Sequence, residues 1–161
     1  MRSGPVRTLS SALVALFLFV PLLAAQAIGG EIFSREPLTL TRQLGEPVTL
    51  NVELALTEAQ REQGLMFRRS IGENEGMLFD FGETRMVYMW MKNTVLPLDM
   101  LFLDPAGKVV HIHENAVPFS ETIIPSVEPV RYVLEVGAGT VKRLNLSKGD
   151  MASSHTVGKG P

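Results

Sequence analysis

The sequence VYMWMKNTVLPLDMLFLD, residues 87–104, decides how the rest of this chain must fold. It is the longest apolar stretch outside the N-terminus, and its aromatic, methionine and leucine residues are typical of strands buried on both faces. Pro97 cannot donate a hydrogen bond to a neighbouring strand and disfavours helical backbone before it. The stretch therefore predicts a β-hairpin, in which a loop over 94–97 joins a strand over 86–93 to a strand over 98–103.

A centred loop fixes the register of this hairpin and predicts an ion pair across it. Lys92 then faces Asp99, and Trp90 faces Leu101 on the same side. We expect Trp90 and Leu101 to shield the Lys92–Asp99 pair from water on one side. The opposite face is expected to carry apolar side chains, namely Val87, Met89, Met91, Leu98, Met100 and Phe102. A slip of one residue would exchange the two faces.

Short strands are expected along most of the remaining chain. Alternation of apolar and polar residues predicts strands over 38–43, 48–56, 77–81, 108–114 and 130–136, with a last short strand over 141–146. The segment 104–107 reads Asp-Pro-Ala-Gly, which is typical of a type I turn. The strand after this turn should therefore pair with 98–103, placing His111 opposite Met100 and His113 opposite Leu98.

One short helix is expected among the strands. Thr57 and Gln60 form a capping box, which predicts a helix over 58–63 that ends at Gly64. Six to eight short strands with one short α-helix predict a mainly β fold, either an antiparallel β-barrel or a sandwich.

The N-terminus has the pattern of a secretory signal peptide over 1–27. Arg2 and Arg7 precede an apolar run over 12–25, and the sequence Ala-Gln-Ala at 25–27 is a small-x-small cleavage site. We expect cleavage after Ala27 and a periplasmic or secreted protein, with an uncleaved anchor as the alternative. The mature chain should then form a single β-rich domain over 28–150, followed by a disordered tail over 151–161.

Composition excludes several classes of function. The chain has no cysteine, which excludes disulfides, thiolate metal sites and a cysteine nucleophile. Without the two arginines of the leader, 13 basic residues face 17 acidic ones, a net charge of −4. Such a surface does not favour nucleic acid as a partner, nor a membrane once the signal peptide is removed. The glycines mark turns and form no phosphate-binding loop, so no cofactor is predicted.

Several short motifs resemble a widespread prokaryotic family, catalogued as domain of unknown function 192. The motifs are GLMFR at 64–68, GMLF at 76–79, WMKNT at 90–94, PLD at 97–99, VLE at 133–135, Ala-Gly at 138–139 and Gly-Asp at 149–150. The resemblance covers about residues 38–150. It implies a compact, mostly β domain that is often exported. It implies no activity, so it assigns no catalytic residue.

The polar residues of the central stretch suggest a binding pocket. A pocket for a small molecule pairs apolar walls with a few fixed polar groups. Trp90, Lys92, Asn93, Asp99 and Arg131 are the candidate ligand-binding residues, and the ligand would be a small molecule or a partner protein of the cell envelope. The structural alternative is that Lys92 and Asp99 form only a salt bridge that closes the hairpin.

Two further functions remain open as alternatives. Met89, Met91 and Met100 share a face with His111 and His113, and thioether with imidazole ligands suits Cu(I), although methionine is also a common core residue. Asp99 or Glu114 could serve as acid or base in an enzyme acting on envelope carbohydrate. Catalysis is less favoured, because no Gly-x-Ser-x-Gly motif is present and no second carboxylate is evidently placed.

Overall fold

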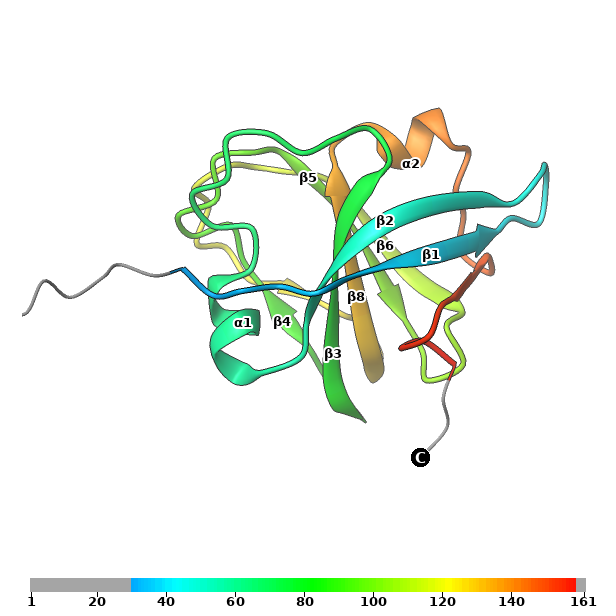
Figure 1. Cartoon of the computed structure of the whole chain (residues 1–161), viewed down its shortest axis with the longest axis horizontal. Coiled ribbons are helices and arrows are strands. Elements are labelled where there is room, and N and C mark those ends of the chain that lie inside the picture. The colour runs from blue at the N-terminus through cyan, green and yellow to red at the C-terminus, as the bar shows by residue number, and fades with distance from the viewer. Residues whose placement is uncertain (1–29, 159–161) are drawn as a thin grey trace, which may run out of the picture.

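The computed structural model describes residues 30–158, so the expected signal peptide lies outside the described residues. A seven-stranded sheet dominates the fold, with the strand order β6-β5-β8-β3-β2-β1-β9 (Figure 1). Its strands are β1 (Arg35–Thr41), β2 (Val48–Ala55), β3 (Glu75–Arg85), β5 (Leu98–Leu103), β6 (Val109–Ala116), β8 (Val130–Gly137) and β9 (Met151–Ser153). The expectation of a mainly β fold is confirmed.

The large sheet curls into a half-barrel whose two ends meet. Strand β9 pairs with β1, and Lys108, next to β6, forms a bridge with Met151 of β9. The backbone N–H of Ala152 also donates to the carbonyl of Gly107, at 2.8 Å. Strands β2 and β3 run parallel, which requires a long crossover, whereas the other neighbouring pairs of the sheet are antiparallel.

Four smaller elements complete the described chain. Strands β4 (Tyr88–Met89) and β7 (Ile124–Pro125) form a separate two-stranded sheet. Helix α1 (Glu58–Gln63) lies in the β2–β3 crossover, and its expected capping box is present. Helix α2 (Thr140–Arg143) follows β8. No helix within residues 30–158 is both long and apolar enough to span a bilayer.

Apolar residues cover both faces of the sheet, as the sequence of residues 98–103 predicts. The inner core draws on β1, β2, β3, β5, β8 and α2, and includes Leu101 and Leu103 of β5. The outer core lies on the other face of β3, β5 and β8, and includes Met100 and Phe102. All six residues of β5 are buried. Full burial of such a side chain stabilises the fold by about 1.5–3 kcal/mol, so β5 is a main source of stability.

The hairpin predicted over 86–103 does not form, and its register is therefore wrong. Strand β5 pairs with β6 on one side and with β8 on the other. Strand β4 instead pairs with β7. A strand that is apolar on both faces is best stabilised between two other buried strands, and β8 supplies the second partner from a distant part of the sequence.

The predicted Lys92–Asp99 ion pair is also wrong. The carboxylate of Asp99 is fully buried and accepts hydrogen bonds from two backbone N–H groups, those of Asn115 at 2.9 Å and Val141 at 3.0 Å. Lys92 lies elsewhere, with its ammonium 5.0 Å from the centre of the Trp90 ring. Asp99 therefore ties β6 and α2 to β5 and is a structural residue.

The predicted grouping of side chains on the two faces of these strands is partly confirmed. Met89, Met91 and Met100 do lie together in the outer core, as expected. Strand β6 pairs with β5 after the predicted turn, but His113 faces Met100 and His111 faces Phe102. This register differs by two residues from the expected one. A shift of two residues keeps every side chain on its face.

Two expectations for the C-terminal part are corrected. The segment expected to be a strand over 141–146 instead contains α2, because the Asp99 carboxylate accepts from the first turn of this helix. The tail expected to be disordered from residue 151 instead contains β9, which hydrogen-bonds to β1. Ala152 and Val157 are buried in the inner core, which explains why this polar segment is ordered.

Candidate ligand-binding cleft

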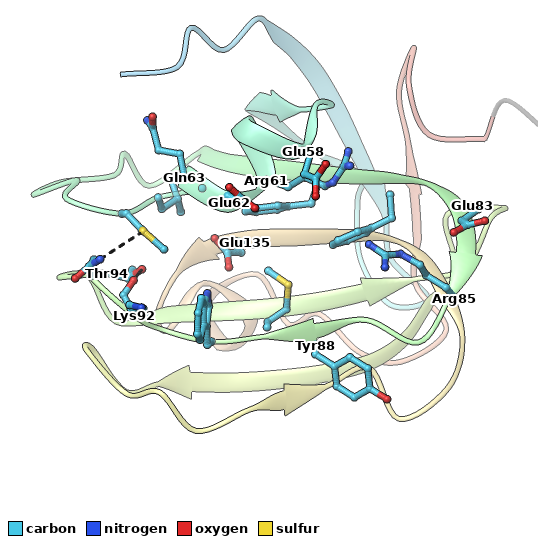
Figure 2. Close-up of a pocket in the computed structure, with 18 residues that line it drawn as sticks. Glu58, Arg61, Glu62, Gln63, Glu83, Arg85, Tyr88, Lys92, Thr94 and Glu135 are labelled. Atoms are coloured by element: carbon cyan, nitrogen blue, oxygen red, sulfur yellow. Dashed lines mark hydrogen bonds between the residues drawn. The ribbon is translucent and has the colours of Figure 1, made fainter. Parts of the chain in front are cut away.

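A cleft of about 790 Å³ opens between α1, the end of β3 and the segment that carries β4 (Figure 2). Its walls are apolar and aromatic, formed by Leu65, Met66, Phe79, Phe81, Tyr88, Met89 and Trp90. Its rim is charged, with Glu58, Arg61, Glu62, Glu83, Arg85 and Lys92. A cleft of this volume, with apolar walls and several charged groups, has room for a small molecule.

Helix α1 is too short to be stable alone and is fixed by hydrogen bonds from two of its side chains. The Gln60 amide donates to the carbonyl of Ile32 at 2.8 Å. The Arg61 guanidinium donates to the carbonyls of Leu56, at 2.6 Å, and Asp80, at 2.9 Å. These bonds fasten α1 to β3 and to the segments beside β1 and β2, so this wall of the cleft is built from fixed groups.

Two motifs that are distant in the sequence, GLMFR at 64–68 and WMKNT at 90–94, meet at one edge of the cleft. The backbone N–H of Phe67 donates to the carbonyl of Asn93, at 2.9 Å. The side-chain amide of Asn93 points to the sulfur of Met66, at 3.9 Å, as the dashed line in Figure 2 shows. Phe67 and Asn93 both have positive φ, 63° and 54°, a conformation that asparagine adopts readily but that is strained for phenylalanine. Such strain is often found where a loop serves a binding site.

A partly buried charge network anchors the GLMFR motif at 64–68. Glu53 of β2 pairs with Arg68 at 2.5 Å and with Arg35 at 2.7 Å. The Glu53 side chain is only 10% exposed. The network therefore ties the loop after α1 to the sheet and helps to hold the edge of the cleft in place.

The floor of the cleft contains one buried carboxyl group, that of Glu135 on β8. Glu135 is 4% exposed, and its cross-strand neighbours are Met77 of β3 and Met100 of β5, which are fully buried. Burial raises the pKa of Glu135 to about 8. Figure 2 shows the carboxyl projecting from β8 toward the side chains that line the cleft. Within residues 30–158 no hydrogen bond or ion pair to another group engages this carboxyl, and its oxygens reach the open space of the cleft.

The structure brings three of the five predicted site residues together. Trp90, Lys92 and Asn93 line the cleft. Asp99 does not, because it is buried under α2. Arg131 also lies away from the cleft, where its guanidinium pairs with Asp80 at 3.2 Å, a contact that raises the pKa of Arg131.

Sequence reasoning missed Glu135, although a signal was present. Glu135 stands between Leu134 and Val136 in a strand whose other inward and outward positions are almost all apolar. An isolated acid in such a strand indicates either a buried partner or a site. Alternation alone predicts a half-buried strand, which would place this acid at the surface.

The candidate residues of the two alternative functions lie in other surroundings. Met91 and Met100 are fully buried in the outer core, and His111 stacks against Phe102 with ring centres 5.4 Å apart. Glu114 is exposed on β6 and does not line the cleft. Within residues 30–158, no three His, Asp or Glu side chains are grouped closely enough to share a metal ion.

Comparison with known families identifies the relatives of this fold. The model of the DUF192 family, described as "Uncharacterized ACR", matches residues 39–154. The chain belongs to the DUF192 family. This match includes α1, β3, β4 and β8, the elements that build the cleft. A search of curated proteins finds no match to this chain.

Two solved structures of uncharacterised proteins resemble this DUF192 domain over most of its length. A protein from Sinorhizobium meliloti 1021, labelled as a candidate transcription regulator, is 57% identical with a TM-score of 0.76, covering 78% of this chain and 98% of the other. A protein of unknown function from Novosphingobium aromaticivorans is 40% identical with a TM-score of 0.70, covering 73% of this chain and 83% of the other.

Proposed function

We propose that this DUF192 domain is an exported binding module that holds a small molecule in the cleft beside Trp90. A single observation carries the proposal: Glu135, an acid without a partner among the described residues, is buried at the floor of a cleft with aromatic walls. Leaving a buried polar group without a partner lowers stability, and a ligand that supplies the partner would restore it. Trp90, Lys92 and Asn93 would contact the same ligand from the side.

Export is part of this proposal and is supported by the signal-peptide pattern over 1–27. The domain would then act in the periplasm or outside the cell. Its ligand would be a small molecule of that compartment, and an envelope protein is the other partner considered. The label of the Sinorhizobium protein does not lead us to propose DNA binding, because the net charge of this chain is −2.

The carbohydrate-active enzyme is not proposed, because its two carboxylates do not share the cleft. Both oxygens of Asp99 accept backbone hydrogen bonds in the interior, and Glu114 is exposed on β6. The copper alternative is not proposed either. Met91 and Met100 have no exposed surface, so a metal ion would have to displace core packing to reach them.

Binding can be measured through Trp90, which is the only tryptophan of the chain and lines the cleft. The purified protein would be screened against metabolites and cell-wall fragments by thermal unfolding, and each hit titrated by tryptophan fluorescence. A ligand at 100 times its Kd should raise the free energy of unfolding by about 2.7 kcal/mol, which shifts Tm by several degrees.

Matched variants decide whether a hit occupies the cleft. Asn93→Ala and Lys92→Met should weaken binding, while Lys142→Met, an exposed lysine outside the cleft, should leave it unchanged. Fluorescence changes that respond equally to Lys92→Met and Lys142→Met would contradict the proposal. A protein that shows no hit and instead co-purifies with an envelope protein would favour a pure interaction role.

A further inference from the structure

We propose that the ligand of the cleft carries a cationic nitrogen, as an amine, amidine or guanidinium, which forms an ion pair with the carboxylate of Glu135. The inference rests on the proposed function and names the chemical class of the ligand. An apolar or aromatic body attached to this nitrogen would pack against Trp90.

The surroundings of the Glu135 carboxyl within the sheet offer it no hydrogen-bond donor. On the sheet, Met77 and Met100 flank it from the two neighbouring strands, and neither side chain can donate a hydrogen bond. No side chain or backbone group within residues 30–158 bonds to it, and its oxygens face the open space of the cleft. Burial among these thioethers leaves its ionised form without compensation. A compensating group must therefore enter from the open side of the carboxyl, which is the cleft.

The cations of the cleft are already engaged. Arg61 donates to two backbone carbonyls and lies 5.6 Å from the centre of the Phe81 ring. Arg85 lies 5.0 Å from the centre of the same ring. Lys92 lies 5.0 Å from the centre of the Trp90 ring. None of the three pairs with Glu135, so the positive charge would come from the ligand.

The charge of Glu135 favours a cation over an anionic or a neutral ligand. An anion would be repelled by Glu135 once ionised, whereas the rim contributes no net charge, because its three acids are matched by three cations. A neutral hydroxyl could bond to the protonated carboxyl but would gain no charge interaction. An ammonium or guanidinium gains an ion pair with the carboxylate, and such charge-assisted hydrogen bonds are stronger than those between neutral groups. The aromatic walls also accept cations on their ring faces, as the positions of Lys92 and Arg85 show.

Binding of a cation should release a proton, which gives the inference a specific signature. With a pKa of about 8, roughly nine-tenths of the Glu135 carboxyls are protonated at pH 7. A protonated amine that binds the carboxylate leaves the amine charged, and the carboxyl proton goes to the buffer. A neutral ligand that bonds to the protonated carboxyl releases none.

The experiment compares amines with neutral isosteres by titration calorimetry on the purified protein. The probes are 2-phenylethylamine with 2-phenylethanol, and hexylamine with hexanol, each at pH 7 in two buffers of different ionisation enthalpy. We expect at least one amine to bind ten-fold or more tightly than its alcohol, with about 0.9 proton released per amine bound. Glu135→Gln should abolish the preference, and Glu83→Gln, which removes an exposed rim acid, should retain it.

The possible failures separate the inference from the proposed function. An alcohol that binds as tightly as its amine, without proton release, overturns the cationic ligand but leaves a binding cleft. Probes at about 10 mM detect binding even when the Kd is above 1 mM. If no probe binds at this concentration and the metabolite screen gives no hit, both proposals are refuted. The amine–alcohol comparison and the proton count need only the unmodified protein, so the test stands even if Glu135→Gln does not fold.

Discussion

The buried Glu135 should make the stability of this protein depend on pH in a direction opposite to that of most paired acids. Its pKa is about 8 in the folded protein, and its ordinary value in an unfolded chain is 4.5. The unfolded chain therefore loses this proton near pH 4.5, while the folded protein keeps it until about pH 8. The contribution to stability is fully present below pH 4.5 and is lost as pH rises to about 8.

The magnitude follows from the two pKa values. Each pKa unit corresponds to about 1.4 kcal/mol, so the complete loss is roughly 5 kcal/mol. Between pH 5 and pH 8 the loss from this group alone is roughly 3–4 kcal/mol. A domain of this size has a total stability of about 5–15 kcal/mol, so the change is large enough to measure.

The assay is urea unfolding of the wild type and Glu135→Gln at pH 5 and pH 8. The glutamine side chain of the variant keeps the shape of glutamate and cannot ionise, so other titrating groups cancel in the comparison. The free energy of unfolding of the wild type should fall by roughly 3–4 kcal/mol more than that of the variant between the two pH values. Glu83→Gln should behave as wild type, because Glu83 is exposed. Equal pH dependence in the wild type and Glu135→Gln would refute the reasoning.

Three further predictions concern the stability of the fold. Asp99→Asn should lower the free energy of unfolding by roughly 2–4 kcal/mol, because an amide cannot accept both buried N–H bonds. Lys92→Met should change it by less than about 1 kcal/mol, and equal effects of the two variants in urea unfolding would argue against the structural role of Asp99. Gly107→Ala should lower the free energy of unfolding by roughly 2–4 kcal/mol, because φ is 87° and a Cβ would lie 2.1 Å from the carbonyl oxygen of Ala152 in β9. An unchanged Tm would show that β9 does not close the sheet. Thr57→Ala should cost about 0.5–2 kcal/mol through loss of the capping box, and a variant as stable as wild type would mean that α1 is held by its side-chain bonds alone.

Alternation with a period of two residues predicted the faces of the strands but not their partners. It correctly placed Met89, Met91 and Met100 in one core, because side-chain direction follows from local backbone geometry. It could not show that β5 pairs with β8, whose register joins Leu101 to Leu134. Two apolar segments close in sequence favour a hairpin, but a strand buried on both faces gains more from two strand partners.

The candidate site was predictable where the motif itself forms the wall. Trp90, Lys92 and Asn93 belong to one short segment, so their proximity needed no knowledge of the fold. Asp99 was assigned to the site only through the predicted hairpin register, and because that register is wrong Asp99 does not line the cleft. Glu135 could be placed in the cleft only after the order of strands was known, because it reaches the floor from β8.

The stability and the binding properties of Glu135 must agree with each other, because they depend on the same ionisation. The loss of stability toward pH 8 is the free energy needed to ionise a carboxyl without a partner. A cationic ligand binds the ionised form, so its affinity should rise about ten-fold per pH unit below pH 8 and level off above it. The pH at which binding levels off must equal the pH at which the stability difference between wild type and Glu135→Gln stops growing. If binding and stability level off at different pH values, the amine is held by a group other than Glu135.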